Sequence, residues 1–308
     1  MKDFDVLVAG EINPDLIMTG PNLSIQFGQV ENLVEKAVMT IGSSSCIFAC
    51  GAARLGLRVA FIGVVGDDIF GHFMLRALES RGIDILNIII DKKQKTGLSV
   101  NLSRGNDRAV LTYIGAINAL KAEQISDELI KKTRHLHIAS YFLQNNLRLG
   151  VKGLFNKAKK MGVSTSLDIN WDPARKWTGI NEILDVIDIL FLNEVEVKAL
   201  SGNEKVKTAV KMLGKKVDIV AVKLGADGAI VQKDAKTVFI PAFPVEVIDA
   251  IGAGDSFDAG FVYGYLRNWL LEKSLKLAVA CGSLSTTGHG GTEAQPTLEE
   301  ALQLVGKI

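Results

Sequence analysis

A glycine-rich turn that runs into a helical pattern constrains this chain more than any other stretch. The segment Asp249–Phe261 reads DAIGAGDSFDAGF, and from about Gly254 aromatic residues recur every four positions, at Phe257, Phe261 and Tyr265. This spacing predicts a helix that begins at the glycines. The first amides of a helix have no partner within it, and the helix dipole is positive there. We therefore predict an anion site at this turn, with phosphate as the expected anion.

Asp255 lies at this predicted phosphate site, where its charge needs an explanation. A carboxylate repels phosphate unless it has a chemical role, and the expected role is to take the proton from a hydroxyl that attacks phosphorus. A structural helix cap is the alternative, because Asp is common near helix starts. Two familiar phosphate loops do not fit. The chain has no Gly-x4-Gly-Lys-Ser/Thr motif, and Phe257 stands where a dinucleotide fingerprint needs a small residue.

Composition limits the classes of protein to consider. The chain has 308 residues, of which 48% are hydrophobic and 22% charged, and its net charge is +1. This balance fits a globular protein with a sizeable core and gives no electrostatic reason to expect nucleic acid or an anionic membrane as partner. No apolar run reaches the length of a membrane span, and the start of the chain lacks a cleavage-site pattern. Three widely spaced cysteines predict reduced thiols and a cytoplasmic location.

The glycine turn resembles the second signature of the ribokinase-like, or PfkB, carbohydrate kinases. That signature reads Asp-Thr-x-Gly-Ala-Gly-Asp-Ser/Thr-Phe, and the chain matches it from Gly252 to Phe257. Ala250 and Ile251 depart from it, because threonines are usual at both positions. The resemblance implies that Asp255 is the catalytic base. It also implies an anion hole for the transferred phosphoryl group, formed by the amides of Gly252, Ala253 and Gly254.

The loop after the first predicted strand is a candidate acceptor site. Phe4–Ala9 is a short apolar strand, and Gly-Glu-Ile-Asn-Pro-Asp follows it. Open parallel sheets bind ligands at the carboxyl ends of their strands, where Asn13 and Asp15 would suit hydroxyl groups. Ordinary turn chemistry is the alternative for Asn-Pro-Asp. The loop resembles the family's amino-terminal Gly-x-Ile-Asn-x-Asp, which implies that Asp15 binds the substrate.

The small-residue segment after residue 41 and the stretch that follows it resemble the first PfkB signature. The shared patterns are Ala-Arg-Leu-Gly and Gly-x-x-Gly-Asp-Asp-x-Phe-Gly. A glycine pair is usual where this chain has Gly42 and Ser43, which we include among the substrate-binding residues. A ribokinase would carry Lys at Ser44 and Asn at Ile47, and both would contact its sugar. Because Ile47 cannot bind a hydroxyl, we predict a partly apolar pocket, and ribose is disfavoured as the substrate.

Alternating strand patterns predict a hairpin that belongs to a lid. By resemblance, the lid over the sugar is built from about 12–40 and 96–115. Asn101 is a candidate substrate contact, and Arg104 and Arg108 could reach the site, although a solvated hairpin face is an equal alternative for the arginines. No repeat, low-complexity tract or linker interrupts the chain. We therefore expect a single domain that spans all 308 residues, with the lid inserted in it.

Strand-like and helix-like segments alternate after residue 118, which predicts a parallel sheet with helices on both faces. We expect helices at 122–132, 146–161 and 180–187, and strands at 134–139, 163–167 and 188–192. Together with the resemblance, this gives a ribokinase-like α/β fold. It has three α/β/α layers, a mostly parallel central sheet and a small β-sheet lid.

Two later strand ends carry oxygen-bearing side chains. Asp168 and Asn170 are two residues apart, so they share a face if the chain is still extended, and the family often has Asp-x-Asn here, near both substrates. Asn193 and Glu196 lie one helical turn apart, and hard cations such as Mg²⁺ prefer oxygen ligands. A capped, charged helix start is the alternative for that pair. The resemblance to the family's Asn-x-x-Glu motif implies that both residues organise Mg²⁺ and phosphate through water.

The carboxyl-terminal third is expected to bind the nucleotide. Residues 219–231 predict a strand, a glycine turn and a second strand, and by resemblance this loop borders the nucleotide. The resemblance also implies that the apolar helix at 274–287 and the loop after it line the adenine pocket. The resulting cofactor contacts are Asn193, Lys223, Gly225, Gly228 and Cys281. Asp249 and the carbonyl of Ile251 would contribute to a monovalent-cation site, but the missing threonines leave activation by K⁺ open.

The order of these motifs leads to one functional expectation. The chain is predicted to be an ATP- and Mg²⁺-dependent kinase that phosphorylates a primary alcohol of a sugar or a sugar-like molecule. A nucleoside kinase and a 2-keto-3-deoxygluconate kinase of the same family are the alternatives. A non-catalytic sugar or nucleotide sensor is the alternative from a different class, against which Asp255 argues. An exposed lid sheet also suggests a homodimer.

Overall fold

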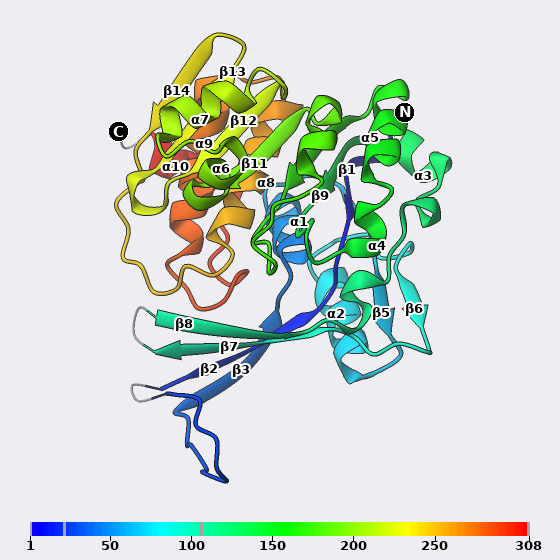
Figure 1. Ribbon diagram of the computed structural model, residues 1–308, viewed down its shortest axis with the longest axis vertical. Helices are drawn as coiled ribbons and strands as arrows, with labels where there is room; N and C mark the ends of the chain where they lie inside the picture. The colour runs from blue at the N-terminus through cyan, green and yellow to red at the C-terminus, as the bar shows by residue number, and fades with distance from the viewer. Residues whose placement is uncertain (1, 21–22, 105–106, 307–308) are drawn as a thin grey trace.

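The computed structural model describes residues 2–20, 23–104 and 107–306, in which strands and helices alternate around one large sheet (Figure 1). The strands are β1 (Phe4–Ala9), β2 (Pro14–Thr19), β3 (Lys36–Ile41), β4 (Val59–Ile62), β5 (Val64–Gly66), β6 (Ile89–Asp91), β7 (Leu98–Arg104), β8 (Asp107–Tyr113), β9 (Thr133–Ile138), β10 (Ser164–Asp168), β11 (Ile189–Asn193), β12 (Ile219–Lys223), β13 (Ala229–Lys233) and β14 (Lys236–Ile240). The helices are α1 (Ser44–Arg54), α2 (Ile69–Glu79), α3 (Asp127–Lys131), α4 (Asn145–Arg148), α5 (Val151–Lys160), α6 (Glu194–Ser201), α7 (Val206–Leu213), α8 (Ala253–Leu266), α9 (Leu271–Ser285) and α10 (Leu298–Val305).

The large sheet has eight strands in the order β14-β13-β12-β11-β10-β9-β1-β4. The six strands from β12 to β4 run parallel, and β13 and β14 add an antiparallel edge. Parallel strands that alternate with helices put the carboxyl ends of the strands at one edge of the sheet, where ligands of this architecture bind. The predicted fold class is confirmed.

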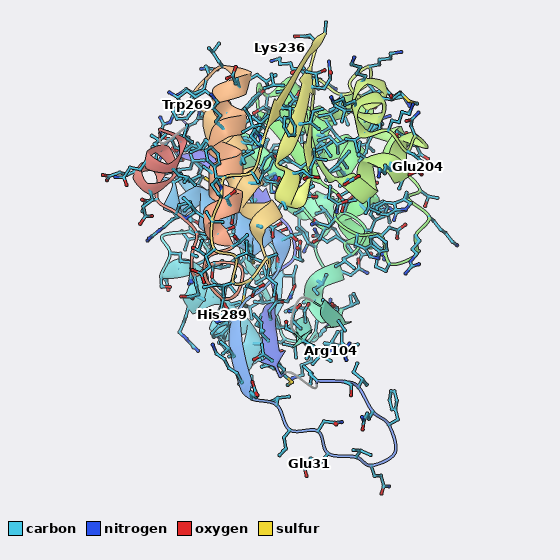
Figure 2. All side chains as sticks on the ribbon, turned by 90° about the vertical axis from the view of Figure 1, so that its left-hand side faces the viewer. Glu31, Arg104, Glu204, Lys236, Trp269 and His289 are labelled. Carbon is cyan, nitrogen blue, oxygen red and sulfur yellow. The ribbon has the colours of Figure 1, made fainter. Side chains whose placement is uncertain are left out.

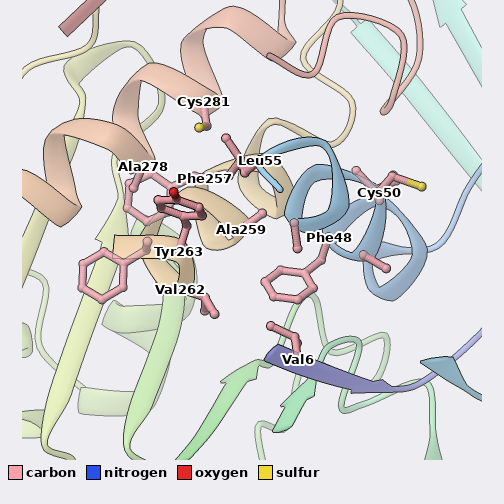
Figure 3. Close-up of a cluster of buried hydrophobic side chains, with 14 of the residues drawn as sticks. Val6, Phe48, Cys50, Leu55, Phe257, Ala259, Val262, Tyr263, Ala278 and Cys281 are labelled. Carbon is pink, nitrogen blue, oxygen red and sulfur yellow. The ribbon is translucent and has the colours of Figure 1, made fainter. Parts of the chain in front are cut away.

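Each face of the sheet is covered by its own hydrophobic core. Successive strand residues point to opposite faces, so Val6 and Val8 enter one core and Leu7 and Ala9 the other. The first core is shared with α1, α8 and α9, and Figure 3 shows Val6 below the side chains that these helices contribute. The second is shared with α5, α6 and α7. Burial of each large apolar side chain stabilises such a core by roughly 1.5–3 kcal/mol.

A second sheet of four strands, in the order β3-β2-β7-β8, stands away from the main body (Figure 1). Strand β2 follows β1 directly and pairs in parallel with β7, while β3 and β8 pair antiparallel at the edges. Both segments predicted for the lid contribute strands to it. The connection between β2 and β3 projects beyond the sheet at Glu31, as Figure 2 shows, and carries the exposed Phe27 and Leu33.

Three of the predicted elements differ from the structure. The helix expected at 180–187 is wrong, because two 3₁₀ turns, Ile180–Glu182 and Leu184–Val186, occupy this segment. The buried residues here are Ile180, Ile183, Leu184, Val186 and Ile187, and this set fits both the α period and the 3₁₀ period, so burial does not distinguish the two.

The other two differences are interruptions. The helix expected at 146–161 is divided into α4 and α5, and the helix expected at 122–132 is reduced to a 3₁₀ turn (Ala122–Gln124) and α3.

Among the described residues, no helix has both the length and the apolar character needed to cross a membrane.

Candidate active site

The amino end of α8 is open to a ligand because no side chain caps it. Gly252 precedes the helix with a φ of 72° and makes no side-chain hydrogen bond. A Cβ atom on Gly252 would lie 2.7 Å from Cα of Gly291 and 2.8 Å from Cγ2 of Ile47, so only glycine fits. The amide of Ala253 makes only a long bond of 3.4 Å to the carbonyl of Ala250. Backbone donors therefore converge at this helix start, as an anion site requires.

Asp255 is the third residue of α8 and is only 7% exposed. The helix-cap alternative for Asp255 is wrong, because Gly252 is the cap residue. Burial raises the pKa of Asp255 to about 8, and the charge of Asp168 adds to this, while Lys223 and a hydrogen bond with Ser44 lower it. A carboxylate with a pKa in this range is a stronger base than an ordinary aspartate, which suits it to abstract a proton near neutral pH.

Lys223 at the end of β12 joins two further buried carboxylates. Its Nζ lies 2.6 Å from Oδ2 of Asp168 and 3.2 and 3.3 Å from the two carboxylate oxygens of Asp258. Although burial opposes ionisation of Asp168, the Lys223 ammonium holds the pKa of Asp168 below its usual value. Burial raises the pKa of Asp258 well above its usual value. Oxygens of Asp168, Asp255 and Asp258 all lie within 4.8 Å of one another.

The predicted acceptor loop lies against the start of α1. Asp15 packs on Gly42, where a Cβ atom would lie 2.1 Å from the Asp15 carboxylate oxygen and 2.8 Å from its amide nitrogen. Ser43 has a φ of 69°, and its hydroxyl donates to the carbonyl of Glu11 at 2.6 Å and accepts from the amide of Cys46. Gly42 and Ser43 therefore hold the acceptor loop against α1, and Ser43 caps that helix.

Asn101 on β7 is the lid residue with a free donor. It is buried, and its Nδ2 has no hydrogen-bond partner among the described residues. A buried amide donor without a partner is costly, so a ligand oxygen would satisfy it. Asn13 directly precedes β2, and its Nδ2 donates to the Ser99 hydroxyl at 3.4 Å. Asn13 and Asn101 thus both lie near the pairing of β2 with β7.

One expectation about the contacts near the acceptor is wrong, and another loses its supporting observation. Asn170 does not share an extended face with Asp168, because β10 ends at Asp168 and Asn170 has a φ of 51°. The Asn170 side-chain oxygen accepts instead from the amide of Ser140 at 2.7 Å. Ile47 is 3% exposed and packs against Gly252 and Gly291, so it supports the phosphate turn. Its apolar character is therefore weak evidence about the acceptor.

Asn193 and Glu196 form a reciprocal cap at the start of α6. The Asn193 amide nitrogen donates to Glu196 Oε2 at 2.8 Å, and the Glu196 amide donates to Asn193 Oδ1 at 2.9 Å. The structure therefore shows the capped helix start that the sequence offered as the alternative to a metal site. Glu196 is nevertheless buried, and burial together with the charge of Asp168 raises its pKa to about 7. A buried acid of this kind, near other carboxylates, remains a candidate to organise a cation.

The predicted nucleotide contacts divide into two groups. Gly225 and Gly228 have positive φ values of 58° and 105°, and a Cβ atom on Gly228 would lie 2.1 Å from the carbonyl oxygen of Ile240. The loop after β12 therefore needs glycine at this point. Cys281 is 1% exposed, and a Cβ atom on Gly260 would lie 2.9 Å from its Sγ. Cys281 thus packs α9 against α8 (Figure 3) and offers no surface to a nucleotide, which corrects that expectation.

Asp249 connects the glycine turn to a later loop. Its Oδ1 accepts from the amide of Ile251 at 2.9 Å, and its Oδ2 accepts from the amide of Gly290 at 2.9 Å. The two loops that meet at Gly252 are therefore tied together by this carboxylate. A monovalent cation bound here would share the Asp249 oxygens with the two amides.

Sequence reasoning missed several residues that build the site. Gln295 donates to the carbonyl of Ile47 at 2.8 Å and to the Ser256 hydroxyl at 3.0 Å, which fixes α1 against α8. Glu11 is buried and accepts from Ser45 at 2.6 Å, so it anchors the start of α1. Asp258 was also missed, although its position three residues after Asp255 placed it on the same helix face.

A polar cavity of about 610 Å³ lies elsewhere, and it contains none of the predicted site residues. It is lined by Cys50, Ala53, Arg54, Ser80, Arg81, Thr292, Glu293, Gln295 and Thr297. The buried acids Asp168, Asp255 and Asp258 lie outside the lining of this cavity.

Comparisons with known proteins agree with this arrangement. The profile of the pfkB family of carbohydrate kinases matches residues 3–298. The chain is 30% identical over 285 residues to 5-dehydro-2-deoxygluconokinase of Geobacillus thermodenitrificans, covering 87% of this chain and 85% of that protein. It is 31% identical to ATP-dependent ribose-1-phosphate kinase of Halopiger xanaduensis, covering 96% and 95%.

A solved structure is similar over nearly the whole chain. The E. coli protein described as ribokinase II, in complex with ATP and Mg²⁺, superposes with a TM-score of 0.86 at 25% identity, covering 99% of this chain and 100% of that one. With the family profile spanning almost every element described above, the chain belongs to the pfkB family of carbohydrate kinases.

Proposed function

We propose that this kinase transfers the γ-phosphoryl group of ATP to a primary alcohol of a sugar or sugar-like acceptor, with Asp255 as the catalytic base. The observation that carries the proposal is the position of Asp255. It is a buried carboxylate with a pKa raised to about 8, in the first turn of a helix whose amino end has no side-chain cap. A base and an anion site side by side are what phosphoryl transfer to an alcohol requires.

The steps of the reaction follow from the residues. Asp15, Asn13 and the free donor of Asn101 orient the acceptor, whose hydroxyl oxygen attacks the γ-phosphorus of ATP. Asp255 takes the hydroxyl proton, the bond between the γ-phosphorus and the bridging oxygen breaks, and ADP leaves with that oxygen. The amides of Gly252, Ala253 and Gly254 stabilise the charge that develops on the phosphoryl oxygens. In this proposal the lid excludes water that would otherwise accept the phosphoryl group.

The acidic groups around Lys223 fit a magnesium ion. Asp168, Asp255, Asp258 and Glu196 gather four acidic groups around one lysine, and burial followed by the charge of Asp168 raises the pKa of Glu196 to about 7. Asn193 and Glu196 are the residues that would hold Mg²⁺ through water. The ion would neutralise charge on the polyphosphate of ATP.

Activation by K⁺ is a further part of the proposal. Asp249 and the carbonyl of Ile251 are the residues that would hold the cation, and carboxylate and carbonyl oxygens suit it. Rates measured in K⁺ and in Na⁺ at equal ionic strength test this. Equal rates would remove K⁺ from the proposal.

The acceptor class is tested with a panel. Purified protein with Mg-ATP is offered sugars, sugar acids and nucleosides, and ADP release is measured. We expect release with at least one sugar or sugar acid and its loss in Asp255→Asn. Turnover with nucleosides alone would identify the protein as a nucleoside kinase instead. Turnover with 2-keto-3-deoxygluconate alone would identify it as a 2-keto-3-deoxygluconate kinase. Thermal shifts with ligands in the absence of turnover would favour a non-catalytic sensor.

A homodimer through the small sheet and a cytoplasmic location complete the proposal. In the register of the sheet Leu16 pairs with both Met39 and Val100, and Val100 with Leu111, so four apolar side chains form one row. The row lies on the opposite face from Ile17 and Asn101, which are buried toward the site. An exposed apolar sheet face is a natural contact for a second copy. The three cysteines are free thiols, as a reducing compartment requires.

A further inference from the structure

Asp258 lies one helical turn after Asp255 on α8, and none of the motifs accounts for it. It is 1% exposed, which is unusual for an aspartate unless it is paired. Both of its carboxylate oxygens approach Nζ of Lys223, at 3.2 and 3.3 Å. A residue with this geometry acts on the site through the lysine rather than through the substrate.

Lys223 lies along the start of α8. A Cβ atom on Gly254 would lie 3.3 Å from its Nζ and 3.5 and 3.6 Å from the last two carbons of its side chain. The ammonium therefore sits beside the backbone of Gly254, in the first turn, where the helix dipole opposes a cation. Something must hold it there, and two carboxylates do so, Asp168 from the sheet and Asp258 from the helix.

The two carboxylates have different effects on the ammonium. Asp168 alone, at 2.6 Å, would hold the lysine toward the end of β10. Asp258 projects from α8 itself and draws the same ammonium toward the helix. We propose that Asp258 is a positioning residue that holds the Lys223 ammonium beside the amino end of α8, where its charge faces the phosphoryl group in transfer. This inference rests on the proposed function, because it assigns the phosphoryl group to that helix end.

A double-mutant cycle tests the inference. We measure kcat and KM for ATP and for the acceptor in wild type, Asp258→Asn, Lys223→Met and the double variant. Asn keeps the size of Asp but replaces one of the two oxygens that face Lys223 with an amide NH₂ donor, so we expect Asp258→Asn to lower kcat about 10-fold with little change in acceptor KM. Loss of the cation itself should lower kcat about 100-fold. If Asp258 acts only through Lys223, the double variant should be no slower than Lys223→Met.

Folding must be separated from positioning. Lys223→Met leaves buried carboxylates without a cation, which is destabilising, so Lys223→Arg is included to keep the charge. If Asp258→Asn does not fold, Asp258→Ser takes its place in the double-mutant cycle. Melting temperatures are measured for every variant. Lys233 and Asp218 form an exposed pair at 3.7 Å, and Lys233→Met and Asp218→Asn are the matched controls that should keep wild-type kcat.

The outcomes separate this inference from the proposed function. Wild-type kcat in folded Asp258→Asn, or in Asp258→Ser if that variant replaces it, would overturn the role of Asp258. Additive losses in the double variant would also overturn it, because a merely structural residue would not share its effect with Lys223. If the wild type phosphorylates no acceptor, or if Asp255→Asn stays active, it is the proposed function that fails.

Discussion

At the scale of single residues, the site depends on side chains that are absent as much as on those that are present. Gly42 leaves room for Asp15, and Gly252 leaves room for Gly291 and Ile47. Both glycines let the backbone of one loop approach another segment closely, as the proposed site with Asp15 and Asp255 requires. The same closeness removes water from Asp255 and raises its pKa.

Gly252→Ala should disrupt the phosphate turn. The positive φ of 72° and the contact of 2.7 Å with Gly291 both oppose a Cβ atom. We expect a loss of stability of about 1–3 kcal/mol and a larger fractional loss of kcat. Chemical denaturation and initial rates measure the two effects. Gly153→Ala is the control, because a Cβ atom at Gly153 in α5 meets nothing within 4 Å and alanine should stabilise that helix. An unchanged kcat in folded Gly252→Ala would contradict this account of the turn.

The raised pKa of Asp255 makes stability depend on pH. The pKa of this carboxyl group is ordinarily 3.8 and is about 8 in the folded protein, so the folded protein binds this proton more tightly. Its contribution to stability is full below about pH 4 and is lost as the pH rises through about 8. Asp255→Asn carries no such proton, so its melting temperature should rise relative to wild type between pH 5 and pH 9. A constant difference would show that the folded pKa is ordinary. Asp218→Asn, at the surface, is the control.

At the scale of elements, α6 and α8 begin in different ways at the same edge of the sheet. Asn193 and Glu196 cap α6 with their own side chains, whereas Gly252 leaves α8 uncapped. One helix is therefore closed to an anion, and the other is open to it. The capping of α6 also fixes the Glu196 carboxylate close to Asp168, whose charge raises the Glu196 pKa.

Glu196→Gln should separate the cap from the proposed metal role. Glutamine keeps one oxygen to accept from the Asn193 backbone amide and loses only the bond from Asn193 Nδ2, so the melting temperature should fall only slightly. It removes the charge, so we expect the Mg²⁺ concentration for half-maximal rate to rise about 10-fold or more. Asn193→Ala should lower stability by about 1 kcal/mol through loss of the cap. Thr297 and Glu300 form the same box on α10, and Glu300→Gln is the matched control that should leave the Mg²⁺ requirement unchanged. If Glu196→Gln needs the same Mg²⁺ concentration as the wild type, Glu196 has only a capping role.

At the scale of the whole molecule, the small sheet lies next to the carboxyl ends of the parallel strands, where the proposed site lies. Strand β2 begins directly after the acceptor loop, so a movement of the sheet would carry Asp15 with it. Asn101 reaches the same region from β7 through its pairing with Ile17 on β2. The sheet thus has one face toward the site and an apolar face turned away from it.

Leu111→Glu should reveal whether that outer face binds a second copy. Leu111 is 53% exposed, and a charge there would be desolvated in a dimer. We expect the wild type to elute as a dimer and Leu111→Glu as a monomer, measured by size-exclusion chromatography with light scattering. Leu149→Glu, at a residue 88% exposed and far from the sheet in sequence, is the control. A monomeric wild type at micromolar concentration would rule the dimer out.

Much of the fold followed from local patterns. Apolar runs and glycine turns predicted the strands from β9 to β13 to within one or two residues, because a strand's spacing of two and a turn's need for glycine are properties of neighbouring residues. The same patterns failed at 180–187, where spacings of three and four could not be told apart over so few residues. The helix start at Gly252 was predictable, with Asp255 in its first turn, because the glycine turn and Asp255 lie within four residues of one another.

The sequence by itself therefore determined the family and the main sheet, and it led to Asp255 as the proposed base. Only the tertiary structure decided what the isolated polar residues contact. Lys223 reaches carboxylates 55 and 35 residues away, Asn170 binds Ser140 across 30 residues, and Cys281 packs inside a core. The physical reason is that a charged or polar side chain takes its role from whatever the fold brings near it, and no local spacing encodes those neighbours.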